Sequence, residues 1–103
     1  MMEAWEELAP ELPPGPCADH GWPGFERVTG ITRKRYAELI APGLVRKAAI
    51  EKHGESELGV SHTHGDGIHA FEVLRWGSVL ARGIDYDLCD AAWACIQALG
   101  GGE

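Results

Sequence analysis

Apolar residues recur at every second position over much of 68–84, and this spacing predicts paired β-strands. Residues 68–76 are rich in aromatic and branched side chains, and a similar pattern resumes after Gly77. Trp76 and Gly77 stand between the two runs and fit a two-residue turn. The stretch is therefore predicted to be a β-hairpin with Trp76-Gly77 as its loop.

A two-residue loop also fixes which residues of the two strands lie opposite each other. The predicted cross-strand pairs are Val73 with Leu80, Phe71 with Arg82, and Leu74 with Val79, and the predicted buried face carries Phe71, Val73, Leu80 and Ile84.

The spacing of apolar residues changes to the helical period after the hairpin. Asp87 is a candidate N-cap because its carboxylate can accept hydrogen bonds from the first free backbone N–H groups. Asp90 follows in the first turn, where the helix dipole favours an anion, and Gly100–Gly102 are predicted to end the helix. The apolar positions at helical spacing are Leu88, Ala92, Cys95, Ile96 and Leu99.

Residues 32–53 have the pattern of helix, with Thr32 as N-cap and Gly54 as the residue that ends it. Pro42-Gly43 in the middle predicts a break, and so two short helices. Residues 58–64 alternate as a first strand, followed by a turn at 65–67.

Together these elements predict a small α+β domain over residues 32–103. Its order is one or two helices, a three-stranded antiparallel meander and a C-terminal helix, or α-β-β-β-α. Residues 1–31 are predicted to be an irregular, proline-rich, acidic arm with at most one helical turn at residues 3–9. Trp5, Trp22 and Phe25 are expected to anchor this arm on the domain, or else to offer a surface to a partner.

Charge narrows the choice of partners. The chain has 103 residues, a net charge of −7 and a pI near 5.1, so it repels nucleic acid and anionic membranes and attracts basic partners. Residues 32–53 run against this trend, with six basic and two acidic side chains. The basic residues Arg33, Lys34, Arg35, Arg46, Lys47 and Lys52 leave a nucleic-acid-binding helix open as an alternative, although such charges more often solubilise a helix.

The cysteines and the termini indicate a compartment. Cys17, Cys89 and Cys95 are odd in number and lack the spacing of a metal finger or a Cys-x-x-Cys motif. The first residues resemble no secretion signal, and no apolar run approaches the roughly 20 residues that span a bilayer. A cytoplasmic protein with no membrane contact is expected.

Three histidines and an aspartate lie close together between Ser61 and His69. Imidazoles two residues apart on a strand point the same way, so His62, His64, Asp66 and His69 could hold zinc, or simply form an exposed turn. The string His62-x-His64-x-Asp66 resembles the metal-binding signature of metallo-β-lactamase-type hydrolases. It departs from that signature at Gly67, where the family has another histidine. The resemblance implies a metal site on these residues but no hydrolytic activity.

The order of elements from Lys47 to Leu99 is similar to that of double-stranded-RNA-binding domains, which are also α-β-β-β-α. That family binds phosphates with lysines at the start of its last helix. This chain has Asp85-Tyr-Asp-Leu-Cys-Asp90 at that place, and carboxylates oppose phosphate binding. The resemblance thus implies a shape without the RNA-binding site.

No catalytic motif is visible, so an enzyme is not expected. The predicted function is binding of another protein, basic or nucleic-acid-binding, with homodimerisation through an open sheet edge as a further possibility. Small phage-encoded inhibitors such as anti-CRISPR proteins are similar in size and charge, which suggests a nucleic-acid mimic. The predicted partner-binding residues are Asp66, Glu72, Trp76, Asp85, Tyr86, Asp87, Asp90 and Trp93.

Overall fold

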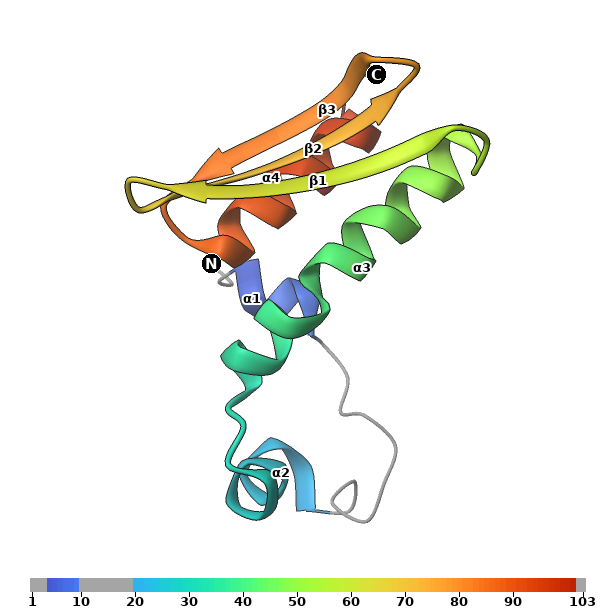
Figure 1. Cartoon of the computed structure of the whole chain (residues 1–103). Helices are drawn as coiled ribbons and strands as arrows, with labels where there is room; N and C mark the ends of the chain where they lie inside the picture. The colour runs from blue at the N-terminus through green and yellow to red at the C-terminus, as the bar shows by residue number, and fades with distance from the viewer. Residues whose placement is uncertain (1–3, 10–19, 102–103) are drawn as a thin grey trace.

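The computed structural model describes residues 4–9 and 20–101, which form four helices and one sheet (Figure 1). The strands are antiparallel in the order β1-β2-β3, which confirms the predicted α+β class. The elements are α1 (Ala4–Leu8), α2 (Gly21–Thr29), α3 (Arg33–His53), β1 (Leu58–Gly65), β2 (Ile68–Arg75), β3 (Ser78–Asp85) and α4 (Leu88–Gly101).

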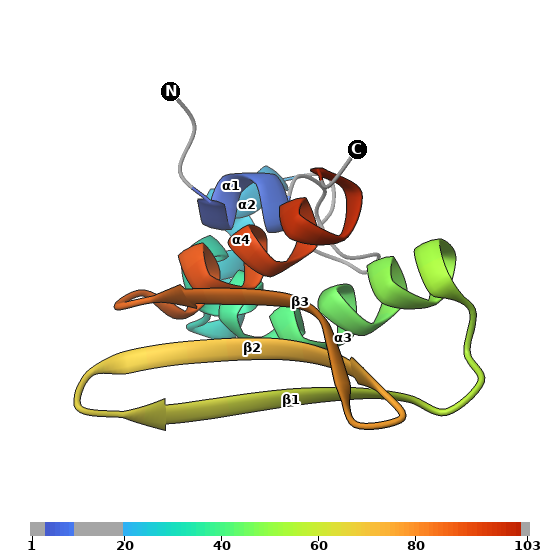
Figure 2. The same ribbon diagram turned by 90° about the horizontal axis from the view of Figure 1, so that it is seen from above.

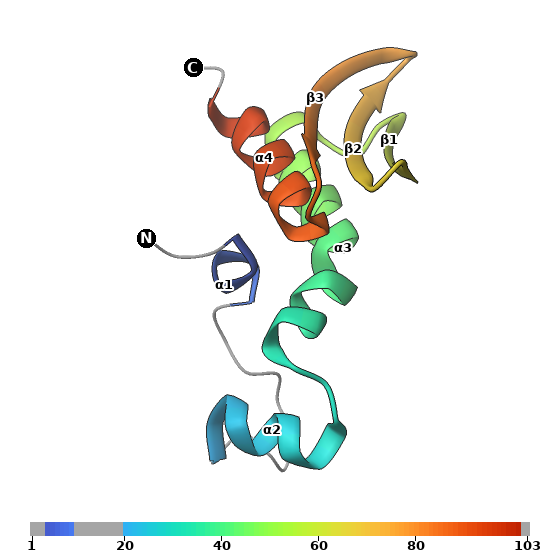
Figure 3. The same ribbon diagram turned by 90° about the vertical axis from the view of Figure 1, so that its left-hand side faces the viewer.

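The helices that pack on the sheet lie on one of its faces (Figure 2). α4 packs against β3 and β2, while α3 lies beside α4 and reaches β1. Short α1 packs against both α3 and α4, and α2 lies beside the N-terminal end of α3, away from the sheet (Figure 3). The opposite face of the sheet carries no helix among the described residues, so we call it the open face.

Two-residue turns join the strands. Asp66 and Gly67 in the first turn, and Trp76 and Gly77 in the second, all have positive φ angles between 50° and 79°. Two successive positive φ angles are typical of the type I′ turn, whose twist matches that of paired strands. The predicted Trp76-Gly77 loop is therefore confirmed.

The predicted pairing beyond the second turn is wrong by one residue. Leu74 pairs with Val79 as expected, but a register shift follows between Val73 and Leu74, which leaves Leu80 as an extra residue. Val73 therefore faces Ala81, and Phe71 faces Gly83. Because one residue of shift exchanges the two faces of a strand, Ala81 and Gly83 are buried and Ile84 is 54% exposed.

The bulge has a packing reason in the contact between β3 and α4. A Cβ atom at Gly83 would lie 2.1 Å from the backbone oxygen of Ala91 and 2.4 Å from the backbone nitrogen of Cys95. Only glycine fits so close to a helix backbone. The shift of register is what brings Gly83 to this position opposite Phe71, in place of Arg82.

The predicted break at Pro42 is also wrong, because α3 is a single helix. Pro42 is exposed, so its ring projects from the solvent side while the buried side continues unbroken past it. Packing of that side offsets the backbone hydrogen bond that proline cannot donate. The buried side is a row of small residues at a spacing of four: Ala37, Ala41, Val45 and Ala49.

Both ends of α3 are capped as predicted. The Thr32 hydroxyl accepts a hydrogen bond from the backbone nitrogen of Arg35 at 3.0 Å, and Gly54 ends the helix at a φ of 84°. The Arg75 guanidinium from β2 donates to the carbonyl oxygens of His53 and Gly54. The last turn of α3 is thereby fixed to the sheet.

The N-terminal arm is not irregular throughout, because residues 21–29 form α2. Pro23 is the third residue of this helix, where its missing N–H has no helical partner to lose, and Gly30 ends the helix in the left-handed conformation. The proline-rich part of the prediction, residues 10–19, lies outside the described residues.

Arg33 joins the arm to the domain. Its Nε donates to the carbonyl oxygen of Ala9 at 2.8 Å, and its Nη2 to that of Glu6 at 3.3 Å. The guanidinium carbon also lies 5.6 Å from the ring centre of Trp5 and 5.5 Å from that of Trp22, within cation–π range. Trp22 further packs on Phe25 and Tyr36, so the expected anchors do contact the domain.

Substitution of Gly83 tests the close approach of β3 and α4. We expect Gly83→Ala to lower the free energy of unfolding by about 3 kcal/mol or more, because the methyl group must displace helix backbone. Gly59→Ala is the matched control, since no atom lies within 4 Å of a Cβ there. Urea unfolding would measure both, and equal effects would contradict the packing described here.

Candidate interaction surfaces

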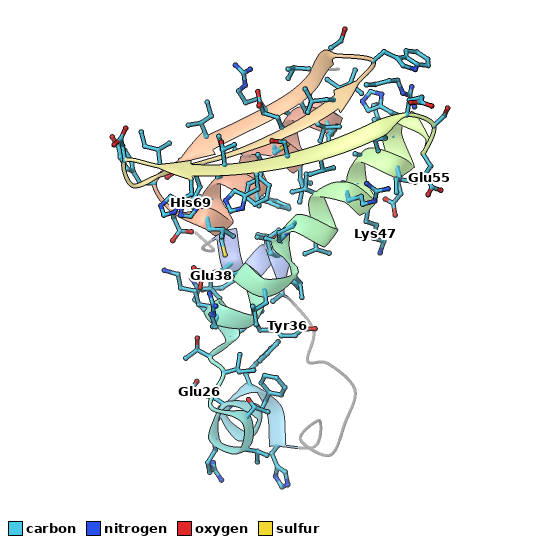
Figure 4. The ribbon with its side chains drawn as sticks, in the orientation of Figure 1. Glu26, Tyr36, Glu38, Lys47, Glu55 and His69 are labelled. Carbon is cyan, nitrogen blue, oxygen red and sulfur yellow. The ribbon has the colours of Figure 1, made fainter. Side chains whose placement is uncertain are left out.

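Three imidazoles gather where β1 and β2 meet their turn (His69 is labelled in Figure 4). His62 Nε2 lies 3.0 Å from His69 Nδ1, and the His64 and His69 rings stack with centres 4.0 Å apart. The other side of the group is closed by Phe71, whose ring stacks on His62 at 4.3 Å. Burial lowers the pKa of His62 below its ordinary value, and the neighbouring His69 and His64 lower it further.

This group does not have the geometry of a metal centre. The His64 and His69 rings are parallel to within 5°, and Asp66 is exposed in the turn, so the predicted ligands do not converge on a point. Among the described residues no set of three or more His, Cys, Asp or Glu side chains is placed to hold a metal ion. The zinc site stays a prediction without a converging ligand set.

The predicted partner-binding residues do not form one surface. Trp76, which is 75% exposed, occupies the β2–β3 turn, whereas Asp85 and Tyr86 lie at the other end of β3. Glu72 lies on the open face, where its Oε2 accepts a hydrogen bond from Arg82 Nε at 2.8 Å and lies 2.6 Å from Arg82 Nη2. Asp66 is in the β1–β2 turn, which the pairing of His69 with Asp85 brings to the same end as Asp85.

Asp87 has a structural role at the start of α4. Its Oδ1 accepts from the backbone nitrogens of Cys89 and Asp90 at 2.9 and 3.2 Å, which confirms the predicted N-cap. Its Oδ2 also lies 3.3 Å from Lys34 Nζ. Burial acts to raise the pKa of Asp87, but the Asp90 N–H and the Lys34 ammonium outweigh it and hold that pKa below its ordinary value.

The remaining predicted residues differ in exposure. Tyr86 is 75% exposed, and its backbone nitrogen donates to Asp85 Oδ1 at 2.7 Å. Asp90 is half-buried beside the cap. Trp93 is half-buried and packs against the core from α4, on the side away from β3.

The basic residues do not form a continuous nucleic-acid-binding face either. Arg33 donates a hydrogen bond to the N-terminal arm, and Lys34 forms an ion pair with Asp87. Arg35 Nη1 lies 3.6 Å from Glu38 Oε1. Arg46 and Lys47 remain exposed on α3. At least half of these six positive charges are therefore engaged in contacts within the protein.

A groove between α3 and α4 was not predicted from the sequence. It consists of two adjoining hollows of about 290 and 250 Å³, on the side of the helices away from the sheet. Its floor is apolar and its rim is charged, and we call it the helical groove. Its lining residues are Leu8, Leu44, Ala48, Trp93, Ile96 and Leu99 on the floor, with Glu7, Lys47, Glu51 and Lys52 at the rim.

The groove lies outside the reach of sequence patterns because three helices contribute to it. Leu8 comes from α1, Ala48 from α3, and Trp93 from α4. Trp93 is the one lining residue of the groove that is among the predicted partner-binding residues. Lys47, labelled in Figure 4, projects from α3 on the side away from the sheet.

Searches against protein-family models, curated proteins and solved structures found no match. No helix in the described part of the chain is long and apolar enough to cross a bilayer.

Cys89 and Cys95 are buried free thiols, and burial raises their pKa values to about 12 and about 11. Neither thiol is therefore suited to act as a nucleophile at neutral pH.

The cap at Asp87 predicts a dependence of stability on pH. We expect Asp87→Ala to lower the free energy of unfolding by about 1 kcal/mol at pH 7, and Asp87→Asn by less, because asparagine still caps a helix. The pKa of Asp87 is lowered from 3.8, so the advantage of wild type over Asp87→Asn is full above pH 3.8 and is lost as the pH falls through the folded-state pKa. Urea unfolding between pH 7 and 2.5 would measure this advantage, and a constant difference would contradict the assignment.

The imidazole group predicts a linked titration. Because His62 has a folded-state pKa below 6.5, the free energy of unfolding should decrease as the pH falls from 6.5 towards that pKa. We expect His69→Asn to raise the titration midpoint of His62 more than His64→Asn does, since His69 lowers the pKa of His62 more than His64 does. Imidazole NMR signals followed against pH measure this, and a midpoint unmoved by either variant would exclude the coupling.

Proposed function

We propose that this protein is a non-enzymatic protein-binding module whose helical groove takes an amphipathic segment of a partner. The observation that carries the proposal is the apolar floor of that groove, where Leu44, Trp93 and Ile96 remain half-buried. Half-buried aromatic and aliphatic side chains in a hollow are typical anchoring points for partners. A charged rim around them excludes water and orients the bound segment.

The packing of α1 indicates the kind of segment that fits. α1 is only five residues long, and it buries Ala4 and Leu8 against α3 and α4. The helical groove begins at Leu8, where α1 ends. A partner helix with a small and a large apolar residue four positions apart would continue the line of α1 along the same two helices.

Charge favours a basic partner. The net charge of −7 attracts positively charged proteins over a distance, and Glu7 and Glu51 stand at the rim beside Lys47. A basic amphipathic segment of a nucleic-acid-handling protein is the specific form of this proposal. An inhibitor of such machinery, as anti-CRISPR proteins are, is its most specific form, and the size and charge of the chain are what support it.

The carboxylates give less support to mimicry of nucleic acid. Glu72 and Asp87 are neutralised by Arg82 and Lys34, and the exposed Asp66 and Asp85 lie at one end of the sheet. Phosphate mimicry needs a row of unpaired negative charges. We therefore propose that the helical groove recognises the partner and that the net negative charge attracts it over a distance.

Buried free thiols at Cys89 and Cys95 favour a reducing compartment such as the cytoplasm.

A library of amphipathic helical peptides tests the groove. We expect panning on the wild-type protein to select peptides with paired apolar anchors and flanking basic residues. Ala48→Arg should reduce the affinity of these peptides by about tenfold or more, because Ala48 lines both hollows and a long charged side chain would fill them. Isothermal titration calorimetry measures the affinities.

Val28→Arg is the matched control for this experiment. It adds the same side chain at a 71% exposed position on α2, outside the groove, and should leave peptide affinity unchanged. Shifts of the Trp93 indole NMR signal on peptide addition locate the contact. Equal binding by wild type and Ala48→Arg, or an unmoved Trp93 signal, would refute the proposed function.

A further inference from the structure

The open face of the sheet has an order of residues that is complementary to itself. Three cross-strand pairs of β2 and β3 stand side by side on it, and the middle pair is charged while the outer two are apolar. The pairs along the face are Ala70 with Ile84, Glu72 with Arg82, and Leu74 with Val79.

Two of these apolar side chains are exposed to solvent. Ile84 is 54% exposed and Val79 is 44% exposed, while Leu74 beside Val79 is half-buried. Antiparallel sheets often leave one face to water, but that face is then mostly polar. Only β1, with Ser61 and Thr63, follows that rule on this face.

We propose that the open face binds a second copy of this chain, with the two sheets packed face to face. The two-fold axis lies between the two open faces, parallel to the strands and above the midline between β2 and β3. Rotation about this axis lays β2 of one chain over β3 of the other. Leu74 then faces Val79 of the second copy, and Ala70 faces Ile84 of the second copy, so that apolar meets apolar on both sides of the centre.

The charged pair selects this arrangement. Glu72 of each chain faces Arg82 of the other. Within each chain, Glu72 Oε2 and Arg82 Nη2 lie 2.6 Å apart. The contacts within and between the chains therefore form a ring of four alternating charges. A two-fold axis across the strands would instead place Glu72 on Glu72 and Arg82 on Arg82. Like charges in contact oppose association, so the order of the face favours one symmetric dimer.

The size of the contact sets its strength. Two strands of eight residues cover about 27 by 10 Å at the usual strand spacings. This is less than the roughly 800 Å² per partner of a standard stable interface. We therefore expect a reversible dimer with a dissociation constant on the order of 10⁻⁵ M. It differs from the edge-to-edge dimer suggested by the sequence, and it leaves the helical groove on the other side of the molecule uncovered.

Charge exchange at the centre tests the dimer. We expect wild type to dimerise with rising concentration in analytical ultracentrifugation. Glu72→Arg and Arg82→Glu should each raise the dissociation constant by about tenfold or more, because every charge at the centre then has the same sign. An equimolar mixture of these two variants should dimerise again, since two positive side chains of one chain then face two negative side chains of the other.

The double exchange E72R/R82E covers the case in which a single variant fails to fold, because it retains the pair within each chain. It should dimerise with itself but not with wild type. Glu26→Arg and Arg27→Glu on exposed α2 are matched controls that change the charge equally and should leave dimerisation unaffected. Circular dichroism checks the folding of each variant.

Three results would overturn the proposal. The first is a wild-type protein that stays monomeric well above 10⁻⁴ M, roughly ten times the expected dissociation constant. The second is a dimer that the single variants do not weaken. The third is a mixture of folded single variants that remains monomeric, since only the proposed arrangement makes them partners. None of these results bears on peptide binding in the helical groove, so the two proposals fail independently.

Discussion

The contact between Gly83 and the backbone of α4 is the constraint on which the rest of this structure depends. It brings helix and sheet so close that the facing residues must be small, as Ala91 and Cys95 are. A helix held this tightly packs on β3 and β2, and its other side packs against α3 and α1. The helical groove and the open face therefore lie on opposite sides of this central contact.

Local chemistry predicted the elements well. The caps at Thr32 and Asp87, the stop at Gly54 and the Trp76-Gly77 turn each depend on a few neighbouring atoms, and all agree with the structure. The errors come from tertiary packing. The β3 bulge exists because Gly83 must meet α4, and α3 passes Pro42 because its buried row of small residues is continuous on both sides.

The candidate site was less predictable than the fold, for a related reason. The predicted partner-binding residues are close in sequence, but the turn of a hairpin and the free ends of its strands lie at opposite ends of the sheet, which separates Trp76 from Tyr86. Glu72 and Asp87 were predicted to bind a partner, whereas their ion pairs with Arg82 and Lys34 are recognisable only in three dimensions. The helical groove is assembled from three helices, and no single stretch of sequence describes it.

The two-residue turns have a consequence for how the chain folds. Both link strands that are neighbours in sequence, so the whole sheet forms through short loop closures, which cost little conformational entropy. α4 follows β3 directly, so its packing on β3 at Gly83 closes only a short loop. The segment from β1 to α4 is therefore built of contacts between neighbours in sequence, and contacts of this kind are associated with fast folding. α1 contacts α4 only across most of the chain, so this contact closes a much longer loop and costs more conformational entropy.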